Sequence, residues 1–228
     1  MDDAWTVHDA DLPLLSARYA PARCRMITFG LADGGLCVVT PGSDTPEAQH
    51  AELARWGSPR FLLAPNHFHN MGLKSWSERY PDATIVAHPR AIPRLRRRGL
   101  AVEDLTRLEA ALPPGARLFG PPGARQGETW VSLPTATGTA WFVTDAILNE
   151  RRLPPGPLGW FMYALGFRAR LMTNPFFKRL FLPDRAAYKA WVAAELERDA
   201  PTLFLPAHGT ALEGEDLAAR LREVTEAA

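Results

Sequence analysis

The chain has 228 residues, of which 46% are apolar, and this is enough to bury a sizeable core in one large domain spanning residues 1–228. Its formal net charge of +1 gives no overall field that would draw it to nucleic acid or to anionic lipid. No apolar run approaches the roughly 20 residues that span a bilayer, and the acidic start at Met1-Asp2-Asp3 does not have the pattern of a secretory signal. We therefore expect a cytoplasmic protein that binds a small-molecule substrate or ligand.

The first predicted elements form a hairpin that carries both cysteines. Strand-like runs at residues 24–31 and 36–40 flank Asp33-Gly34, the expected type I′ pair of a two-residue turn. That register places Cys37 opposite Gly30 and leaves Cys24 far down the ladder. The sequence therefore predicts two reduced, mostly buried thiols and no disulfide, in agreement with a cytoplasmic setting.

A helix and then a buried strand lead to the first candidate ligands. Thr45 as N-cap and Pro46 at the first helical position predict a helix to about residue 56. A short apolar strand at residues 61–64 then stops at Pro65, and its loop carries His67 and His69. Side chains two apart in an extended loop point to the same side, so two imidazoles there can chelate zinc or iron. Taken alone, such a pair is more often found at a protein surface.

The middle of the chain continues to alternate helices and strands. We expect a helix at residues 73–79, a strand at 83–87, an arginine-rich helix at 89–98 and a helix at 103–112. The arginines suit a phosphate or acidic partner, but a solvated helix face is the favoured reading. After a Pro- and Gly-rich joint, strands at residues 128–133 and 139–144 lead to Asp145. A carboxylate at the tip of a buried strand is either paired, metal-bound or a cap of the next turn.

The last third is aromatic and then helical. Residues 159–172 and 176–181 are rich in aromatic side chains and are interrupted at Gly166. They suit a substrate lid, a homodimer surface or an interfacial membrane helix, and core packing with a covering flap is favoured. Asp184 is expected to cap a helix, and an apolar strand at residues 202–205 stops at Pro206 just before His208.

Three buried strands thus end in loops with metal-ligand side chains: His67 and His69, Asp145, and His208. Because sites in α/β sheets form at the carboxyl ends of strands, we expect these four residues to converge.

At this point the sequence resembles the metallo-β-lactamase superfamily. The order of the H-x-H loop, Tyr80-Pro81-Asp82-Ala83, Val143-Thr144-Asp145 and Leu205-Pro206-Ala207-His208-Gly209 carries the resemblance, from about Met26 to His208. It implies an α/β fold, a four-layer αββα sandwich of two mixed sheets flanked by helices. It also implies one or two zinc or iron ions and hydrolysis of esters, thioesters, lactones, amides or phosphoesters.

The chain departs from the superfamily's H-x-H-x-D-H-x-G loop. Aligned on Gly72, the loop has Pro65 at the first histidine, His67 at the second, His69 at the aspartate and Asn70 at the third histidine. Ala136 stands where a further histidine ligand is expected, while Asp145 and His208 match the bridging aspartate and the last histidine. The resemblance is thus to a degenerate branch.

The ligand count limits the chemistry. His67, His69, Asp145 and His208 are too few for two metals, so at most a mononuclear zinc or iron site is expected. The preferred hypothesis is a metal-dependent hydrolase in which three of them bind the ion and Asp145 acts as the base. A metal-free, non-catalytic protein that binds a ligand or partner is the alternative, and an iron protein with redox or oxygen chemistry is a third.

Overall fold

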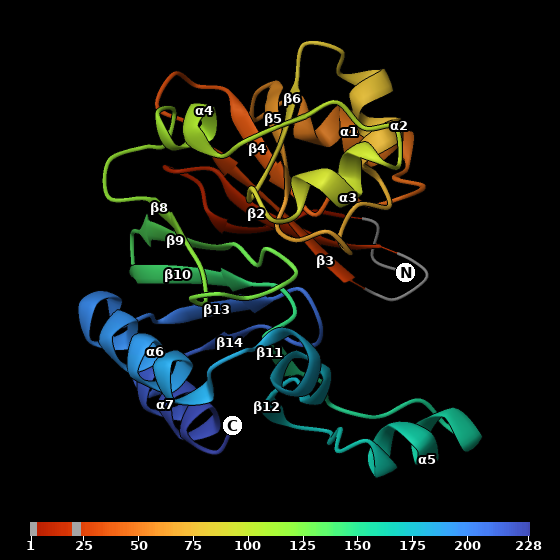
Figure 1. Ribbon diagram of the computed structural model, residues 1–228. Helices are drawn as coiled ribbons and strands as arrows, with labels where there is room; N and C mark the ends of the chain where they lie inside the picture. The colour runs from red at the N-terminus through yellow and green to blue at the C-terminus, as the bar shows by residue number, and fades with distance from the viewer. Residues whose placement is uncertain (1–3, 20–23) are drawn as a thin grey trace.

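Two main sheets stack face to face and carry helices on their outer faces (Figure 1). The computed structural model describes residues 4–19 and 24–228. The first sheet has the order β1 (Thr6–Asp9), β2 (Leu14–Tyr19), β3 (Cys24–Gly30), β4 (Leu36–Val39), β5 (Pro59–Ala64), β6 (Thr84–Ala87) and β7 (Val102–Glu103). It is antiparallel from β1 to β4 and parallel from β4 to β7.

The second sheet is built from the C-terminal half. Its order is β14 (Leu212–Glu213), β13 (Leu203–Pro206), β10 (Gly138–Val143), β9 (Trp130–Thr135) and β8 (Arg117–Phe119). Only the β10–β13 pair is parallel, so these two strands end at the same edge. A separate antiparallel pair, β11 (Ile147–Asn149) and β12 (Leu171–Thr173), follows this edge.

The helices fall into an N-terminal and a C-terminal group. Those of the N-terminal half are α1 (Glu47–Leu53), α2 (Leu73–Arg79), α3 (Ile92–Arg96) and the short α4 (Thr106–Glu109). Those of the C-terminal half are α5 (Pro157–Ala164), the π-helical turn η1 (Phe177–Phe181), α6 (Arg185–Asp199) and α7 (Leu217–Glu226). Figure 1 shows α6 and α7 together on the outer side of the second sheet, with α5 on an extension that leaves the body.

The apolar pattern of the strands explains the layers. Successive strand residues face opposite sides, and in β5 Phe61 and Leu63 pack between the sheets while Leu62 packs under the helices. In β10, Phe142 packs between the sheets and Trp141 packs in the cluster shared with α6 and α7. Three apolar layers separate four structural layers, which confirms the predicted αββα sandwich.

The first hairpin differs from its prediction by one residue. Leu31 and Gly34 close the turn, and Leu31 N–H donates to the Gly35 carbonyl, so the loop has three residues. Gly34 adopts φ of +83°, the left-handed position that this three-residue loop requires. Cys37 therefore lies opposite Phe29, whereas Gly30 was predicted. Both cysteines are nonetheless free and buried, as expected.

The predicted helix caps had mixed outcomes. Asp184 accepts a hydrogen bond from the Ala187 N–H, which confirms it as the cap of α6. The cap predicted for α1 was wrong, because Thr45 donates its hydroxyl hydrogen to the Gly42 carbonyl and the helix begins at Glu47 without a side-chain cap.

Candidate metal centre

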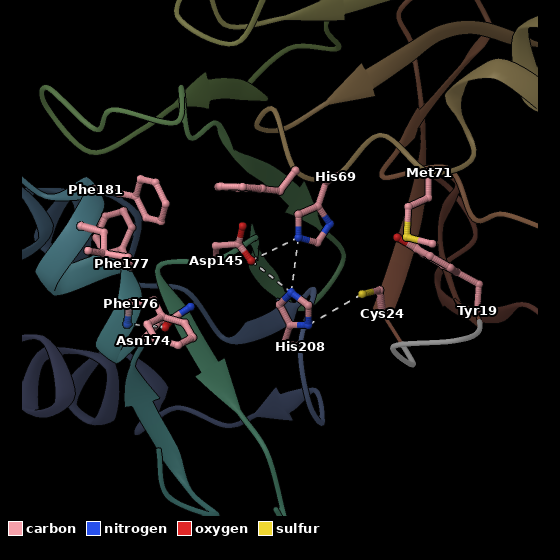
Figure 2. Close-up of a pocket in the computed structure, with 12 residues that line it drawn as sticks. Tyr19, Cys24, His69, Met71, Asp145, Asn174, Phe176, Phe177, Phe181 and His208 are labelled. Carbon is pink, nitrogen blue, oxygen red and sulfur yellow. Dashed lines mark hydrogen bonds and ion pairs between the residues drawn. The ribbon is translucent and has the colours of Figure 1, made fainter. Parts of the chain in front are cut away.

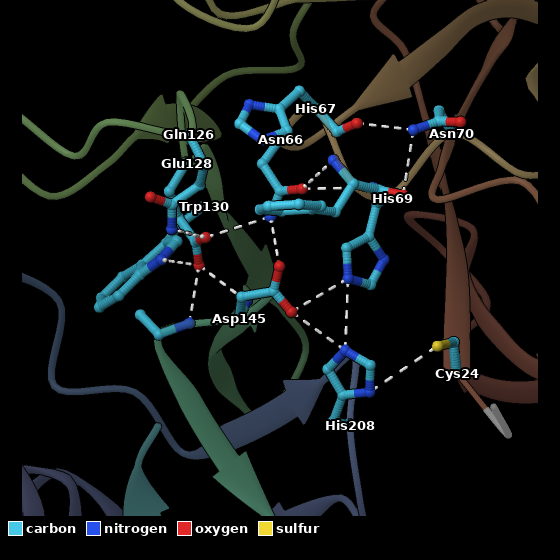
Figure 3. A network of polar contacts seen from close by, with 12 residues as sticks. Cys24, Asn66, His67, His69, Asn70, Gln126, Glu128, Trp130, Asp145 and His208 are labelled. Carbon is cyan, nitrogen blue, oxygen red and sulfur yellow. Dashed lines mark hydrogen bonds and ion pairs between the residues drawn. The ribbon is translucent and has the colours of Figure 1, made fainter. Parts of the chain in front are cut away.

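Three of the four predicted residues meet at one point (Figure 3). Asp145 Oδ1 lies 3.2 Å from His69 Nε2 and 3.1 Å from His208 Nε2. The two imidazole nitrogens are 3.3 Å apart, so the three atoms form a nearly equilateral triangle. His69 follows β5, Asp145 follows β10 and His208 follows β13, so the centre lies where strands of both sheets end.

Asn66 positions two members of this triangle. Its fully buried side chain accepts hydrogen bonds from the Phe68 and His69 N–H groups through Oδ1, which fixes the loop that carries His69. Its Nδ2 donates to Asp145 Oδ2 at 2.7 Å and to Glu128 at 3.2 Å. One amide therefore links the loop after β5 to the carboxylate after β10.

Glu128 is a buried carboxylate that supports Asp145 from behind. Its oxygens accept five N–H donors, from the side chains of Asn66, Gln126 and Trp130 and from the backbone of Asp145 and Ala146. Burial and the nearby Asp145 charge raise the pKa of Glu128 to about 7, against the effect of the donors. The two backbone bonds fix the start of the turn from which the Asp145 side chain projects.

A buried arginine holds the loop that carries His208. Arg25 donates to the carbonyls of Pro206 and Gly209, on either side of His208, and to the Ser16 hydroxyl. The loop is also tied to β11, because Asn149 N–H donates to the His208 carbonyl. The backbone on both sides of His208 is therefore fixed by contacts from β3 and β11.

Cys24 extends the cluster on its other side. Its sulfur lies 3.7 Å from His208 Nδ1, and Cys24, His69 and His208 each offer a ligand atom within 4.8 Å of the others. Burial alone would lower the pKa of His208, but its contacts with Asp145 and Cys24 outweigh burial and hold that pKa well above the usual value. Burial would raise the pKa of Asp145, and the two imidazoles instead hold it well below the usual range.

His67 lies apart from the centre. Its Nε2 is 3.2 Å from an Arg94 guanidinium nitrogen, and because arginine only donates, that nitrogen of His67 must be the acceptor. Burial, and then Arg94, lower the pKa of His67. Asn70 is likewise held by Arg98, which donates to its side-chain oxygen at 2.7 Å. The predicted convergence of four groups is therefore wrong for His67, which pairs with an arginine.

The arginines at residues 89–98 are all exposed, in agreement with the favoured solvated face. Three of them also make contacts, because Arg94 and Arg98 reach the loop after β5 and Arg96 donates to the Val102 carbonyl. These contacts bind the loop to the helix behind it.

The triangle fits a single metal ion. A tetrahedral ion with ligand bonds of about 2.0 Å has ligand atoms about 3.3 Å apart, because the edge of a tetrahedron is 1.63 times the bond length. The measured edges of 3.1, 3.2 and 3.3 Å match one face of such a tetrahedron. Imidazole and carboxylate are also ligands that zinc and iron accept. The spacing of His69, Asp145 and His208 is therefore compatible with one such ion, and Cys24 offers a further ligand atom close to both imidazoles.

A cavity of about 440 Å³ opens in front of the triangle (Figure 2). Asp145, His69, His208 and Cys24 form its polar end. The rest of its lining is mainly apolar: Phe68, Met71, Phe176, Phe177, Leu180 and Phe181. The second aromatic group of the sequence, residues 176–181, thus covers the site, and the cavity suits a ligand with an apolar part beside a reactive group.

No protein-family profile and no curated protein sequence matches this chain. Several solved structures, by contrast, match the fold of this chain. The DIM-1 metallo-β-lactamase exposed to ceftazidime aligns with a TM-score of 0.60 at 12% identity, over 98% of this chain and 96% of that chain. The metallo-β-lactamase FIM-1 from Pseudomonas aeruginosa in its mono-zinc form gives 0.60 at 14% identity, over 98% and 94%. TTHA1623 in a di-iron-bound form gives 0.57 at 18% identity, over 90% and 97%.

The chain has the metallo-β-lactamase fold. The alignment covers nearly the whole of the described chain, so the two sheets and the edge that carries the triangle belong to one shared architecture. Within residues 4–19 and 24–228 of this metallo-β-lactamase fold, no helix has both the length and the apolar character needed to cross a bilayer.

Sequence reasoning missed three residues of this metallo-β-lactamase-fold site: Asn66, Glu128 and Cys24. Asn66 had a readable signal, because asparagine before a loop often accepts from backbone N–H groups two and three residues on. Glu128, like Asp145, is an acid next to an apolar strand, but the sequence pattern singles out only Asp145. Cys24 gave no local signal, since its place beside His208 depends on how the two sheets pack.

Proposed function

We propose that this protein is a metal-dependent hydrolase with a mononuclear centre held by His69, Asp145 and His208. The observation that carries the proposal is the triangle of donor atoms, whose edges of 3.1, 3.2 and 3.3 Å match a tetrahedral face. Solved structures of the same fold, described as mono-zinc and di-iron forms, support a zinc or iron ion.

The residues around the triangle have different roles in the proposed reaction. Asn66 and Glu128 hold Asp145 in place, and Arg25 holds the His208 loop. A zinc or iron ion bound there supplies a Lewis acid and a water of lowered pKa. The apolar lining from residues 176–181 shields the polar end of the cavity from bulk water and receives the non-reacting part of the substrate. A small ester, thioester or lactone fits this division.

Asp145 is assigned here as a ligand. Its Oδ1 is the atom shared by both histidines, and its Oδ2 accepts from Asn66, so both oxygens already have partners. The role of general base, expected from the sequence, stays a prediction for this residue.

Metal content tests the proposal directly. Protein purified without a histidine tag and without added metal should contain close to one equivalent of zinc or iron by elemental analysis. His69→Ala and His208→Ala should lose it, whereas His67→Ala, a matched change two residues away in the same loop, should keep it. Retention of metal by His69→Ala, or its loss from His67→Ala alone, would overturn the assignment.

A metal-free binding protein is the second candidate, and one observation favours it. Asp145 Oδ1 lies within hydrogen-bond distance of both imidazole Nε2 atoms, so two N–H donors can satisfy it without an ion. On this view the protein takes up no zinc or iron at pH 8, where free histidines are neutral, and it does not hydrolyse small esters, thioesters or lactones in an activity assay. An iron-containing protein with a visible absorption band and no hydrolysis would instead favour redox chemistry.

A further inference from the structure

Helix α5 exposes a group of large apolar side chains. Trp160 is 76% exposed, Phe161 60%, Leu158 58% and Tyr163 57%, and Figure 1 shows the helix on an extension away from both sheets. Of the seven tryptophans, only Trp160 is exposed. Gly159 is the one buried position of the helix, because its backbone packs against the Pro154 carbonyl so closely that a Cβ would lie 1.9 Å from that oxygen. This close packing fixes the helix against the preceding loop and leaves its aromatic side chains exposed.

The exposed side chains do not share one face. Helical residues advance by about 100° each, so positions 158, 160, 161 and 163 point in directions spread around the whole axis. A helix that is apolar all round is normally surrounded by a protein core or by lipid. A flat protein partner covers only one side of such a helix, whereas the interfacial region of a bilayer surrounds an inserted tip completely.

The charge around α5 is strongly positive. Residues 150–182 contain six basic side chains, Arg151, Arg152, Arg168, Arg170, Lys178 and Arg179, and one acidic side chain, Glu150. This segment carries +5 of a chain whose net charge is +1, so the other residues sum to −4. The net charge of the whole chain is small because negative charge elsewhere offsets this positive segment.

The basic residues are placed at both ends of the helix. Arg151 and Arg152 precede it and are exposed, and Arg168 and Arg170 follow it. Arg168 lies over the Tyr163 ring at 3.7 Å and donates to the Tyr163 carbonyl, so a cation is held directly beside the exposed aromatic group. Aromatic rings flanked by arginine match the boundary between lipid tails and anionic headgroups, where tryptophan and tyrosine are enriched and each nearby basic residue adds affinity.

We propose that α5 docks the protein on an anionic lipid surface, with Leu158, Trp160 and Phe161 inserted at the headgroup boundary and the flanking arginines on lipid headgroups. This inference needs no metal at the site and stands apart from the proposed hydrolysis.

The docking segment also borders the candidate site. A cleft of about 610 Å³ runs from Arg151, Arg152 and Met162 at the base of α5 to His208 and Gly209. Docking through α5 would place the mouth of this cleft next to the lipid headgroups, which gives a membrane-associated ligand a short route toward His208.

Vesicle binding by the full chain tests the inference. We would compare co-sedimentation with vesicles of phosphatidylcholine alone and with vesicles containing about 30% phosphatidylserine. The wild type should bind the anionic vesicles and release them as salt is raised to about 0.5 M. Trp160→Ser combined with Phe161→Ser should weaken binding at least about tenfold, and Arg151→Gln with Arg152→Gln by about thirtyfold at low salt. Arg55→Gln with Arg97→Gln, two exposed arginines far from α5 in sequence, is the charge-matched control and should bind like the wild type.

Fluorescence gives a second, position-specific readout. Brominated lipid should quench the emission of the wild type upon binding, and Trp160→Phe should remove that quenching while circular dichroism shows an unchanged fold. The inference is overturned if the wild type does not bind anionic vesicles, or if the Trp160 and Phe161 changes leave binding unaltered. It is also overturned if sedimentation shows a stable dimer in which Trp160 is protected from iodide, because α5 would then be a contact between two copies of the chain.

Discussion

Replacing Asn66 by Asp should make the stability of this protein depend steeply on pH. Asn66 is fully buried, and its Nδ2 lies 2.7 Å from Asp145 Oδ2 and 3.2 Å from Glu128 Oε2. Asp has nearly the same shape, but it turns a shared donor into a third carboxylate. A like charge about 3 Å from Asp145 costs about 5.5 kcal/mol at an effective dielectric constant of 20, and Glu128, whose pKa is about 7, adds a second repulsion above that pH. The new carboxyl therefore takes up a proton instead.

The magnitude follows from the cost of that proton. Holding a group of ordinary pKa near 3.9 protonated costs about 1.36 kcal/mol per pH unit above it, or about 2 kcal/mol at pH 5.5 and about 6 kcal/mol at pH 8.5. The new carboxyl group has a raised pKa in the folded protein. The variant therefore keeps its stability below about pH 4, where the group is protonated in both the folded and the unfolded state, and loses stability as pH rises. Asn66→Ala, by contrast, loses four hydrogen bonds and should cost about 3 to 5 kcal/mol at both pH values.

Urea unfolding at pH 5.5, 7.0 and 8.5, followed by circular dichroism, measures both variants against the wild type. Asn66→Asp should be no less stable than Asn66→Ala at pH 5.5 and clearly less stable at pH 8.5, where it is expected to be close to unfolded. A pH-independent difference between the two variants would refute the reasoning, because it would mean that Asn66 does not separate two buried carboxylates.

Three further changes test other parts of the fold. Arg94→Gln should raise the pKa of His67 measured by NMR titration, although burial keeps it below the free value, and an unchanged pKa would show that the guanidinium is not a significant neighbour. Asp184→Ala removes the side-chain cap of α6 and should lower the free energy of unfolding by about 1 kcal/mol, whereas an unchanged melting temperature would mean that water replaces the cap. Gly72→Ala should destabilise by several kcal/mol in thermal unfolding, because a Cβ there would lie 2.4 Å from the Gly42 carbonyl oxygen, and a stable variant would imply that this loop moves easily.

The fold was readable from local signals because its buried strands are short, continuous apolar runs. In β5, alternate residues pack in different apolar layers, and this pattern requires a sheet with a core on both faces. Turn geometry was less accessible. The sequence Asp33-Gly34 favours a two-residue turn, yet hydrogen bonds from Leu31 set a three-residue loop and shift the register by one. The choice depends on how β3 and β4 fit the rest of the sheet.

The site was predictable only as far as strand ends could be located. His69, Asp145 and His208 each follow a buried strand, and strand direction alone brings their loops to one edge. His67 has the same local pattern as His69, and no property of the loop distinguishes them. The difference comes from Arg94, which approaches from α3 and engages His67. The spacing of residues in the sequence cannot predict a contact of this kind, because it depends on how α3 packs against the loop.

Arg94 and Arg98 also bear on how many ions this edge can hold. An ion bound at His67 Nε2 would lie about 2 Å from that nitrogen, and the Arg94 guanidinium nitrogen lies 3.2 Å from it. The two cations would then be at most about 5 Å apart, and a dication beside a guanidinium at that distance is repelled by about 7 kcal/mol at an effective dielectric constant of 20.

Arg98 adds a second fixed positive charge at Asn70, the neighbouring loop position, which itself offers no imidazole. Because arginine stays protonated throughout the accessible pH range, this repulsion cannot be relieved by titration. The number of ligands is a second, separate obstacle, because Pro65 and Asn70 supply no further imidazole in this loop. We therefore expect that removing the charge by Arg94→Ala would not by itself create a second metal site. Elemental analysis of Arg94→Ala should still give no more than one equivalent of metal. Two equivalents would show that this edge offers enough ligands for a second ion and that the charge of Arg94 had kept that ion out.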